Sequence, residues 1–500
     1  MTDRASGVSS AADLPPEGLS AAVALDAGDA QAVPRTADRF AVGTLRYTQF
    51  GIVTLFIWLL WGDFCFYLME TVIPNVLPLK LKSLDAPNVV VGILLGTVPS
   101  AINFIVNPIV SFRSDRHRGT MGRRIPFLLW ATPPLTMFLV LLGLAEPLGQ
   151  LLHKHIFGPW FNFAPNVAIL TLVAVFMIGF QICNMFIASV YYYLFNDVVP
   201  AAFLSRFMSL FRIVGLCATS LFQFFILPHA QTHMREIFIG AAILYCIAFL
   251  TMCFKVREGE YPPPPEVDKK SGMLSSVKVY FNECFTHRFY RHFFISNALW
   301  AVGASLAPFI LYLNLSIGLE LGTIGRINGA SGILSMLFLY PAGIWSDRMH
   351  PLRMTIVSMV VLVILSPIPL VWLVVDPTQK LVLYVSVASM LAMLPVRVMY
   401  EAASLPVYMR LLPRDRYGQF SSADAMVRSV MMVVTGPLVG LCMDGLRWLH
   451  NGDQFYYRYA PLFVILCQCL SLWYLWKVYR YWKQHGGNES FSPPAVNGAT

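Results

Sequence analysis

Apolar runs recur along nearly the whole chain, and this feature most restricts what the sequence can fold into. A run of roughly 20 apolar residues can cross the hydrocarbon core of a bilayer as a helix, because a helix satisfies its own backbone hydrogen bonds. The composition agrees, since 57% of the 500 residues are hydrophobic, only 13% are charged and the mean hydropathy is +0.61. The chain is therefore predicted to be an all-α, polytopic membrane protein.

Twelve runs are long enough to span a membrane. They lie near residues 46–75, 88–112, 124–147, 166–195, 203–227, 236–255, 291–316, 322–345, 353–375, 379–409, 420–445 and 458–480. The longest connection, about 256–290, contains KVREGEYPPPPEVDKKSG and suits a polar linker between bundles at 46–255 and 291–483. Residues 1–45 and 484–500 are predicted to be disordered tails, and the first tail has no apolar stretch typical of a signal peptide.

The net charge of +9 is distributed unevenly over the predicted loops. If the N-terminus is cytoplasmic, 27 Lys and Arg residues fall on that side and 7 on the other. The positive-inside rule then predicts that both termini are cytoplasmic, in a plasma or inner membrane. This asymmetry accounts for the basic excess, so no nucleic-acid partner is expected.

The sequence gives no support for an enzyme. Nine scattered cysteines form no CxxC pair and ten histidines form no HExxH motif, so no metal or other cofactor is expected. A membrane-bound acyl or glycosyl transferase would need GxSxG or DxD-like clusters, and these are not apparent. A binding or transport protein is favoured.

One charged motif occurs twice, as SFRSDRHRGTMGRRIPF at 111–127 and as GIWSDRMHPLR at 343–353. Asp115 and Asp347 are 232 residues apart, and the segments GILLG and GRING repeat with nearly the same shift. The chain is therefore predicted to be duplicated, with six spans in each half. Two parallel halves with a binding site between them are typical of transporters.

The spacing SDR-x5-GRRxPF resembles the signature loop of the major facilitator superfamily. The preceding NPIV and the later LFNDVVP at 194–200 are similar to the branch of sucrose transporters and glycoside–pentoside–hexuronide:cation symporters. LLPRDRYGQFSSADAMVRSV at 411–430 is similar to superfamily members generally. The resemblance implies a fold of two six-helix bundles, a monomer, and a loop that latches the bundles on the cytoplasmic side.

The residues of this chain that match the signature loop are the candidates for the cytoplasmic gate. They are Asp115, Arg116, Gly122, Arg123 and Arg124 in the first copy, and Asp347 and Arg348 in the second. Carried over from the family, Asp115 pairs with Arg123 or Arg124 and lies near the start of a helix from the other half. The alternative is that these arginines only enforce the topology. The second copy lacks the GRR element, so the latch is expected to be asymmetric.

Ionisable residues inside the spans are the candidates for coupling. Asp63, Tyr67 and Glu70 are spaced i, i+4 and i+7 and share one face of the first span, which is unlikely to contact lipid. A buried carboxylate suits a group that loads and releases a proton, although Glu70 could instead be hydrated near the interface. Arg397 and Glu401 in the tenth span form either a structural salt bridge or a substrate and proton switch.

Sugars are bound by amide and carboxylate hydrogen bonds and by aromatic rings. The candidates are Trp61, Gln181, Asn184, Asn297, Trp300 and Asn328. Packing or an interfacial belt is the alternative for the aromatic residues, and an interfacial position is expected for Tyr191, Tyr192 and Tyr193. Asn103 and Asn107 stand where sodium-coupled relatives carry aspartates, so proton coupling is favoured over sodium, and uncoupled facilitation stays open.

The sequence thus predicts a secondary active transporter of a sugar or glycoside that works by proton-coupled symport and alternating access. Its partners would be the small-molecule substrate, protons and the lipid bilayer. One alternative is an exporter or carrier of a non-sugar metabolite or drug. The other is a superfamily relative that acts in pigment assembly or as a membrane sensor without transport.

Overall fold

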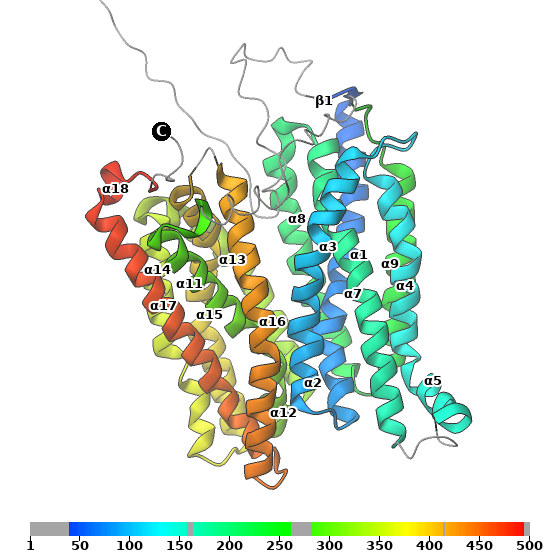
Figure 1. Ribbon diagram of the computed structural model, residues 1–500, viewed down its shortest axis with the longest axis vertical. Coiled ribbons are helices and arrows are strands. Elements are labelled where there is room, and N and C mark those ends of the chain that lie inside the picture. The colour runs from blue at the N-terminus through cyan, green and yellow to red at the C-terminus, as the bar shows by residue number, and fades with distance from the viewer. Residues whose placement is uncertain (1–39, 158–163, 262–282, 414–415, 495–500) are drawn as a thin grey trace, which may run out of the picture.

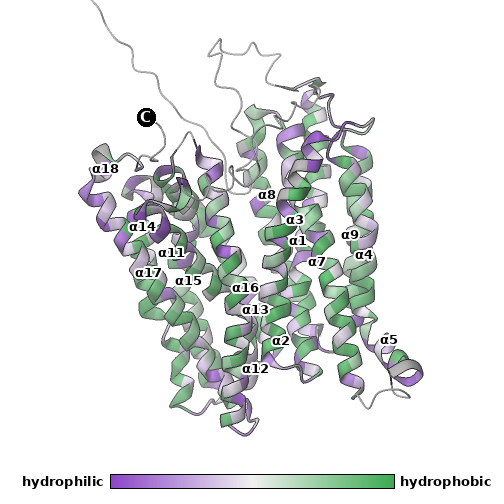
Figure 2. Cartoon of the chain, viewed as in Figure 1, coloured by the Kyte–Doolittle hydropathy of each residue, from purple (hydrophilic) through white to green (hydrophobic). Residues whose placement is uncertain are grey.

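The computed structural model of the chain describes residues 40–157, 164–261, 283–413 and 416–494. Within these ranges twelve helices are long and apolar enough to cross a membrane, which confirms the predicted all-α fold with twelve spans. Figure 2 shows an apolar band between two more hydrophilic ends, as expected of a chain that spans a bilayer.

The first half forms one bundle (Figure 1). Its helices are α1 (Gln49–Ser83), α2 (Asn88–Gly92), η2 (Ile93–Thr97), α3 (Val98–Arg116), α4 (Ile125–Gly143), α5 (Ala145–Leu152), η3 (His153–Phe157), α7 (Pro165–Val198), α8 (Ala201–Leu221), η4 (Phe222–Ile226), η5 (Leu227–His229) and α9 (Met234–Lys255). The segments α2, η2 and α3 follow one another without a break and form one spanning helix. In this half α4 packs between α7 and α9, and α1 packs on α8 and α9.

The second half forms the other bundle (Figure 1). Its helices are α11 (Arg288–Ser305), α12 (Ala307–Ser316), α13 (Leu321–Met349), α14 (Pro351–Leu365), η6 (Ile368–Leu373), α15 (Gln379–Leu411), α16 (Tyr417–Leu449), η8 (Gln454–Tyr459), α17 (Ala460–Gln484) and α18 (Gly487–Ser490). Here α11 packs on α16 and α17, and α15 packs on α13 and α14.

The two ends of the bundle differ. We call the end that carries β1, the charged loop 117–124 and the C-terminal stretch the basic end, and the other the opposite end (Figure 1). The halves meet along two seams, where α16 packs on α2, η2 and α3, and α13 packs on α8, η4 and η5. The larger hydrophobic core crosses between the halves and includes Leu77 of the first half and Met443 of the second.

Both seams bring backbone against backbone, and glycine is required there. A Cβ atom added at Gly92 would lie 2.2 Å from the carbonyl oxygen of Gly436, and one at Gly325 would lie 2.2 Å from that of Gln223. Small residues permit this close approach between helices in a membrane. Gly92 and Gly325 occupy matching positions in the two repeats, so the duplicated segments play the same packing role.

The expected tails are shorter than predicted. Strands β1 (Ala41–Val42) and β2 (Leu45–Arg46) form a small antiparallel hairpin. At the other terminus, the hydroxyl of Tyr290 donates to the carbonyl of Pro494 (2.9 Å), and Phe491 packs against Phe289. Residues 1–39, 262–282 and 495–500 of the predicted tails and linker lie outside the described residues.

Candidate functional site

Asp63 is the most deeply buried of the predicted carboxylates. It lies in α1 with no exposed surface, and neither carboxylate oxygen has a hydrogen-bond partner among the described residues. Its neighbour Gly62 faces α7 and α9, because a Cβ there would lie 3.3 Å from the hydroxyl of Tyr191 and 2.5 Å from the sulfur of Met252. This turn of α1 is thus enclosed by the first bundle.

Tyr67 and Glu70 continue the same face of α1. The Tyr67 ring packs against Phe211 of α8, and the carboxylate of Glu70 accepts a hydrogen bond from the side-chain amide of Asn184 in α7. Tyr67 and Glu70 thus contact α8 and α7, and the proposal that they act together with Asp63 stays a prediction.

Several buried amide oxygens of the first half have no donor in the described part of the chain. They are the side-chain oxygens of Gln181, Asn184 and Gln223. All three residues are at least nine-tenths buried. The amide nitrogen of Gln223 donates to Asn75 of α1 (3.2 Å), which places this amide too beside the first helix. The first bundle thus holds a group of buried acceptors that a hydroxylated ligand could satisfy.

A second carboxylate, Asp424 at the start of α16, was missed by the sequence analysis. It has no exposed surface and accepts hydrogen bonds from the amide of Asn297 (2.9 Å) and the hydroxyl of Tyr408 (2.8 Å). The guanidinium of Arg428 lies 3.0 Å from the same carboxylate. The signal was present, because Asp424 and Arg428 are spaced i, i+4 in an apolar run, as Arg397 and Glu401 are.

The predicted pair in α15 forms but is not buried. Arg397 and Glu401 lie 3.5 Å apart, with 74% and 53% of their side chains exposed. One residue away, the ring of Tyr400 packs against Trp300 of α11 in a tilted arrangement, with ring centroids 4.3 Å apart. Asn328 of α13 is exposed, and Trp61 is 38% exposed and stacks on Phe64.

The charged loop forms a network within the first half. Arg124 pairs with Asp115, as the resemblance implies, and both Arg123 and Arg124 pair with Asp197 at the end of α7. Glu258, just after α9, accepts hydrogen bonds from the backbone N–H groups of Arg123, Arg124 and Ile125 (2.9, 2.8 and 2.6 Å) and so caps the N-terminus of α4.

Comparison with known families decides the identity. A sequence profile of the Major Facilitator Superfamily matches residues 59–436, which is more than half of the chain. The chain belongs to the major facilitator superfamily. Like other members it is a membrane transporter for a small-molecule substrate, and it is not an enzyme.

Solved structures share this superfamily fold at low sequence identity. A bacterial homolog of the human lysosomal transporter Spinster, in an inward-facing and unoccupied conformation, aligns with a TM-score of 0.61 at 12% identity and covers 88% of this chain and 98% of its own. A D-xylose–proton symporter aligns with a TM-score of 0.61 at 13% identity, over 90% of this chain and 99% of its own. The nucleoside transporter NupG aligns with a TM-score of 0.57 at 12% identity, over 85% of this chain and 99% of its own.

The second copy of the superfamily loop is built differently. The side chain of Asp347 lies outside the described residues, and Arg348 is exposed. His350 instead caps α14 by accepting from the N–H of Leu352 (3.3 Å) and packs on Trp482. Burial lowers the pKa of His350 to about 4, with a further contribution from Arg410 and Arg353, so the imidazole is neutral at pH 7. The two copies of the loop therefore differ in their contacts, and their role as a latch stays a prediction.

Two further predictions can be placed on α3 and α7. Asn107 accepts a hydrogen bond from the hydroxyl of Ser189 (2.9 Å), whereas Asn103 is half-buried on the same helix. The interfacial position expected for Tyr191 is wrong, because this residue is fully buried and its hydroxyl donates to the carbonyl of Leu59 (2.7 Å). Its ring packs among Phe66, Phe195 and Phe249, so it belongs to the core of the first bundle.

No metal site is evident in the described ranges, where no group of three or more His, Cys, Asp or Glu side chains could hold an ion. The structure brings only some of the predicted site residues together. Asn184 contacts Glu70 in the first half, and Asn297 contacts Asp424 in the second. Their roles in transport stay predictions.

Proposed function

We propose that this superfamily member is a secondary active transporter that moves a sugar or glycoside together with protons. The observation that supports this best is that four buried side chains of the first half, Asp63, Gln181, Asn184 and Gln223, each have an oxygen without a donor among the described residues. Buried polar atoms without partners are costly, and sugar hydroxyls are donors that would satisfy them. A purely apolar cargo would leave them unpaired.

Asp63 is the proposed proton carrier. An ionised carboxylate without a donor or a counter-ion is costly away from water, so Asp63 is proposed to be neutral in this conformation. It would release the proton when the site opens to water during the transport cycle. Glu70 keeps one hydrogen bond, from Asn184, and is proposed to link this step to the amides that contact substrate.

The second half is proposed to contribute Arg428 and the Trp300–Tyr400 pair. Arg428 lies one helical turn from Met432, whose sulfur accepts from the hydroxyl of Ser100 in α3 (3.2 Å), so this face of α16 is turned toward the first half. The carboxylate of Asp424 forms an ion pair with the guanidinium of Arg428 and so positions it. The aromatic pair offers a face on which a sugar ring could pack.

The orientation predicted from the charge distribution is part of the proposal. The basic end would face the cytoplasm, with both termini on that side of a cell or inner membrane, and the protein would act as a monomer. Drug or apolar metabolite export would favour a site lined mainly by Met and Phe, whereas α1 carries two carboxylates and has the amides of Asn184 and Gln223 beside it. This favours sugar over the exporter alternative.

The test is uptake of labelled mono- and disaccharides into proteoliposomes, with and without an imposed inward proton gradient. The parent should accumulate at least one sugar against its gradient. Asp63→Asn should lose this accumulation and keep exchange of the same sugar at equal concentrations, because only the proton step is removed. Asp376→Asn, which removes an exposed carboxylate, serves as the matched control.

Each outcome has a defined meaning. If the folded parent moves none of the sugars under either condition, the sugar assignment is wrong, and nucleosides and organic acids form the next panel. If Asp63→Asn still accumulates sugar, Asp63 is not the proton carrier.

A further inference from the structure

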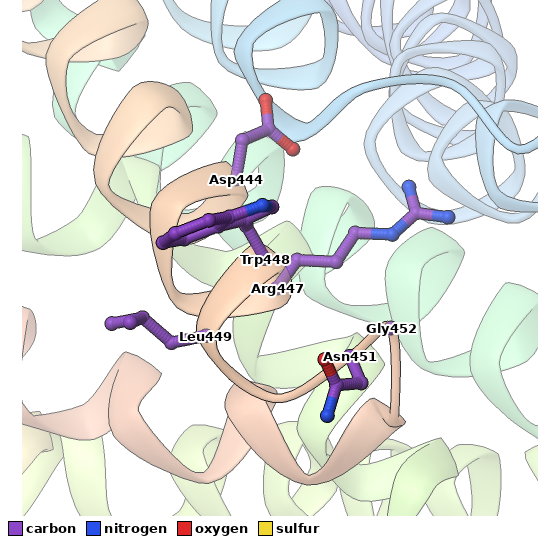
Figure 3. A pocket seen from close by; sticks show the side chains of 6 residues that line it. All are labelled: Asp444, Arg447, Trp448, Leu449, Asn451 and Gly452. Carbon is purple, nitrogen blue, oxygen red and sulfur yellow. The ribbon is translucent and has the colours of Figure 1, made fainter.

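A single carboxylate at the opposite end joins the two halves. Asp444, near the end of α16, accepts hydrogen bonds from the backbone N–H groups of Asn88 (2.8 Å) and Val89 (2.9 Å) and from the side-chain amide of Asn88 (2.8 Å). These are the first residues of the spanning helix that begins with α2. Figure 3 shows the Asp444 carboxylate directed away from α16 toward the blue ribbon of the first half. An anion at a helix N-terminus is favourable, so Asp444 caps α2 across the seam.

The surroundings hold this cap in place. Asn88 is 1% exposed, and its side chain also contacts the hydroxyls of Tyr456 and Tyr457 in η8 (3.2 and 3.4 Å). One turn back along α16, a Cβ added at Gly440 would lie 2.4 Å from the Cα atom of Val89. The Asp444 cap and the close backbone contact at Gly440 therefore both join α16 to the start of α2.

Contacts along the seam show that α16 runs antiparallel to the helix formed by α2, η2 and α3. Val89 pairs with Asp444, the hydroxyl of Thr97 donates to the carbonyl of Val433 (3.1 Å), and Ser100 pairs with Met432. Residue numbers rise on one helix as they fall on the other. The C-terminal end of each helix therefore lies at the end of the bundle where the other begins.

The same register places a second aspartate at the basic end. Continuing from the Ser100–Met432 contact by 15 residues along each helix brings Asp115 level with Tyr417, the first residue of α16. In this structure Asp115 is 48% exposed and pairs with Arg124 of its own half. The aspartate cap at the opposite end is formed, whereas Asp115 is engaged within the first bundle.

We infer that Asp444 forms a latch at the opposite end, in which a carboxylate near the C-terminal end of α16 caps the N-terminus of the spanning helix that begins with α2. The cap of Asp115 on α16 at the basic end is what the resemblance to the superfamily already implies. The Asp444 cap holds the opposite end closed. The latch rests on alternating access, which closes one end at a time, and not on the identity of the cargo.

The experiment measures how readily the opposite seam opens. Thr97→Cys places a thiol in the seam, and its labelling rate by a polar maleimide is followed by mass spectrometry on purified protein in nanodiscs, in a background where Cys442 and Cys469, both exposed, are serine. No substrate or gradient is present, so a wrong sugar assignment leaves the result unaffected.

Asp444→Asn should raise the labelling rate at least about tenfold, because charge-assisted hydrogen bonds to the helix start are lost. Asp453→Asn is the matched control and should change the rate less than about twofold on the same scale. Asp453 lies at the same end, but it caps η8 within its own half by accepting from the N–H of Phe455 (3.3 Å). An unchanged rate in folded Asp444→Asn would overturn the latch.

A second pair of variants guards against misfolding. Asn88→Asp places a second negative charge beside Asp444 and should also raise the labelling rate. The double variant Asn88→Asp with Asp444→Asn exchanges the two side chains, and its labelling rate should return toward that of the parent. Failure of the exchange to rescue would overturn the direct contact between Asp444 and Asn88 as the cause of the latch.

Discussion

Asp63 in the first half and Asp424 in the second are equally buried, yet their surroundings are opposite. Neither carboxylate has exposed surface. Asp424 has an amide, a hydroxyl and a guanidinium as partners, whereas both oxygens of Asp63 lack a donor in the part of the chain that the structure describes. Burial alone therefore does not define what an intramembrane carboxylate does.

We propose that the difference separates a carboxylate with a structural role, Asp424, from one that acts in transport, Asp63. Three partners stabilise the charge on Asp424, and the carboxylate in turn fixes Asn297, Tyr408 and Arg428 from three helices. The Asp63 carboxylate makes no hydrogen bond to another described residue. We therefore propose that its protonation and its contacts change during transport. We expect stability to depend on Asp424 and coupling to depend on Asp63.

The largest effect should come from Asp424→Asn. Removing the charge weakens the ion pair with Arg428 and two hydrogen bonds to a fully buried carboxylate, and we expect a loss of about 2 kcal/mol in the free energy of unfolding. The isosteric change Asp63→Asn should cost less than about 0.5 kcal/mol, because no ion pair is broken. Thermal or denaturant unfolding of both variants in detergent measures this difference directly. Equal losses would contradict the comparison.

A smaller effect is expected for Tyr408→Phe. This change removes one donor, the hydroxyl 2.8 Å from Asp424, and keeps the ring that packs on Phe293. The loss should be about 1 kcal/mol, since the amide and the guanidinium remain. The double variant with Asp424→Asn should lose less than the sum of the two single variants, because both remove the same contact. Strict additivity would show that the hydroxyl acts elsewhere.

The smallest effect should come from Arg397→Ala. Most of the Arg397 and Glu401 side chains is not covered by other parts of the protein, so the substitution removes one i, i+4 ion pair and little packing. We expect a change below about 0.5 kcal/mol in the same unfolding assay. A transport defect in this variant would therefore report on substrate or proton movement and not on folding. A loss as large as that of Asp424→Asn would show that the pair is structural.

Much of the fold could be predicted from the sequence, because the bilayer fixes the length of each span and the apolar runs report it directly. The motif at 111–127 led to the superfamily and to the pairing of Asp115 with Arg124, which the structure confirms. The branch within the superfamily and the substrate are not established by the fold, because members of unlike cargo share it at about 12% identity.

The site was harder to predict, because partners come from helices distant in the chain. Asp424 and Asn297 are 127 residues apart, and nothing local indicates that they meet. Tyr191 was misplaced for a related reason. Its position near the end of a span favoured the interface, but α7 continues to Val198 and keeps the residue inside the bundle.

Because Glu258 caps the N-terminus of α4, the first half extends beyond the end of α9 at Lys255. A cut after Lys255, where α9 ends, would remove the carboxylate that holds three backbone N–H groups, together with Tyr261, whose ring lies 4.2 Å from the guanidinium of Arg123. The hairpin would also lose the N–H of Glu260, which donates to Thr44 (2.8 Å). If the two bundles are produced as separate polypeptides and recombined, the first should run through Tyr261.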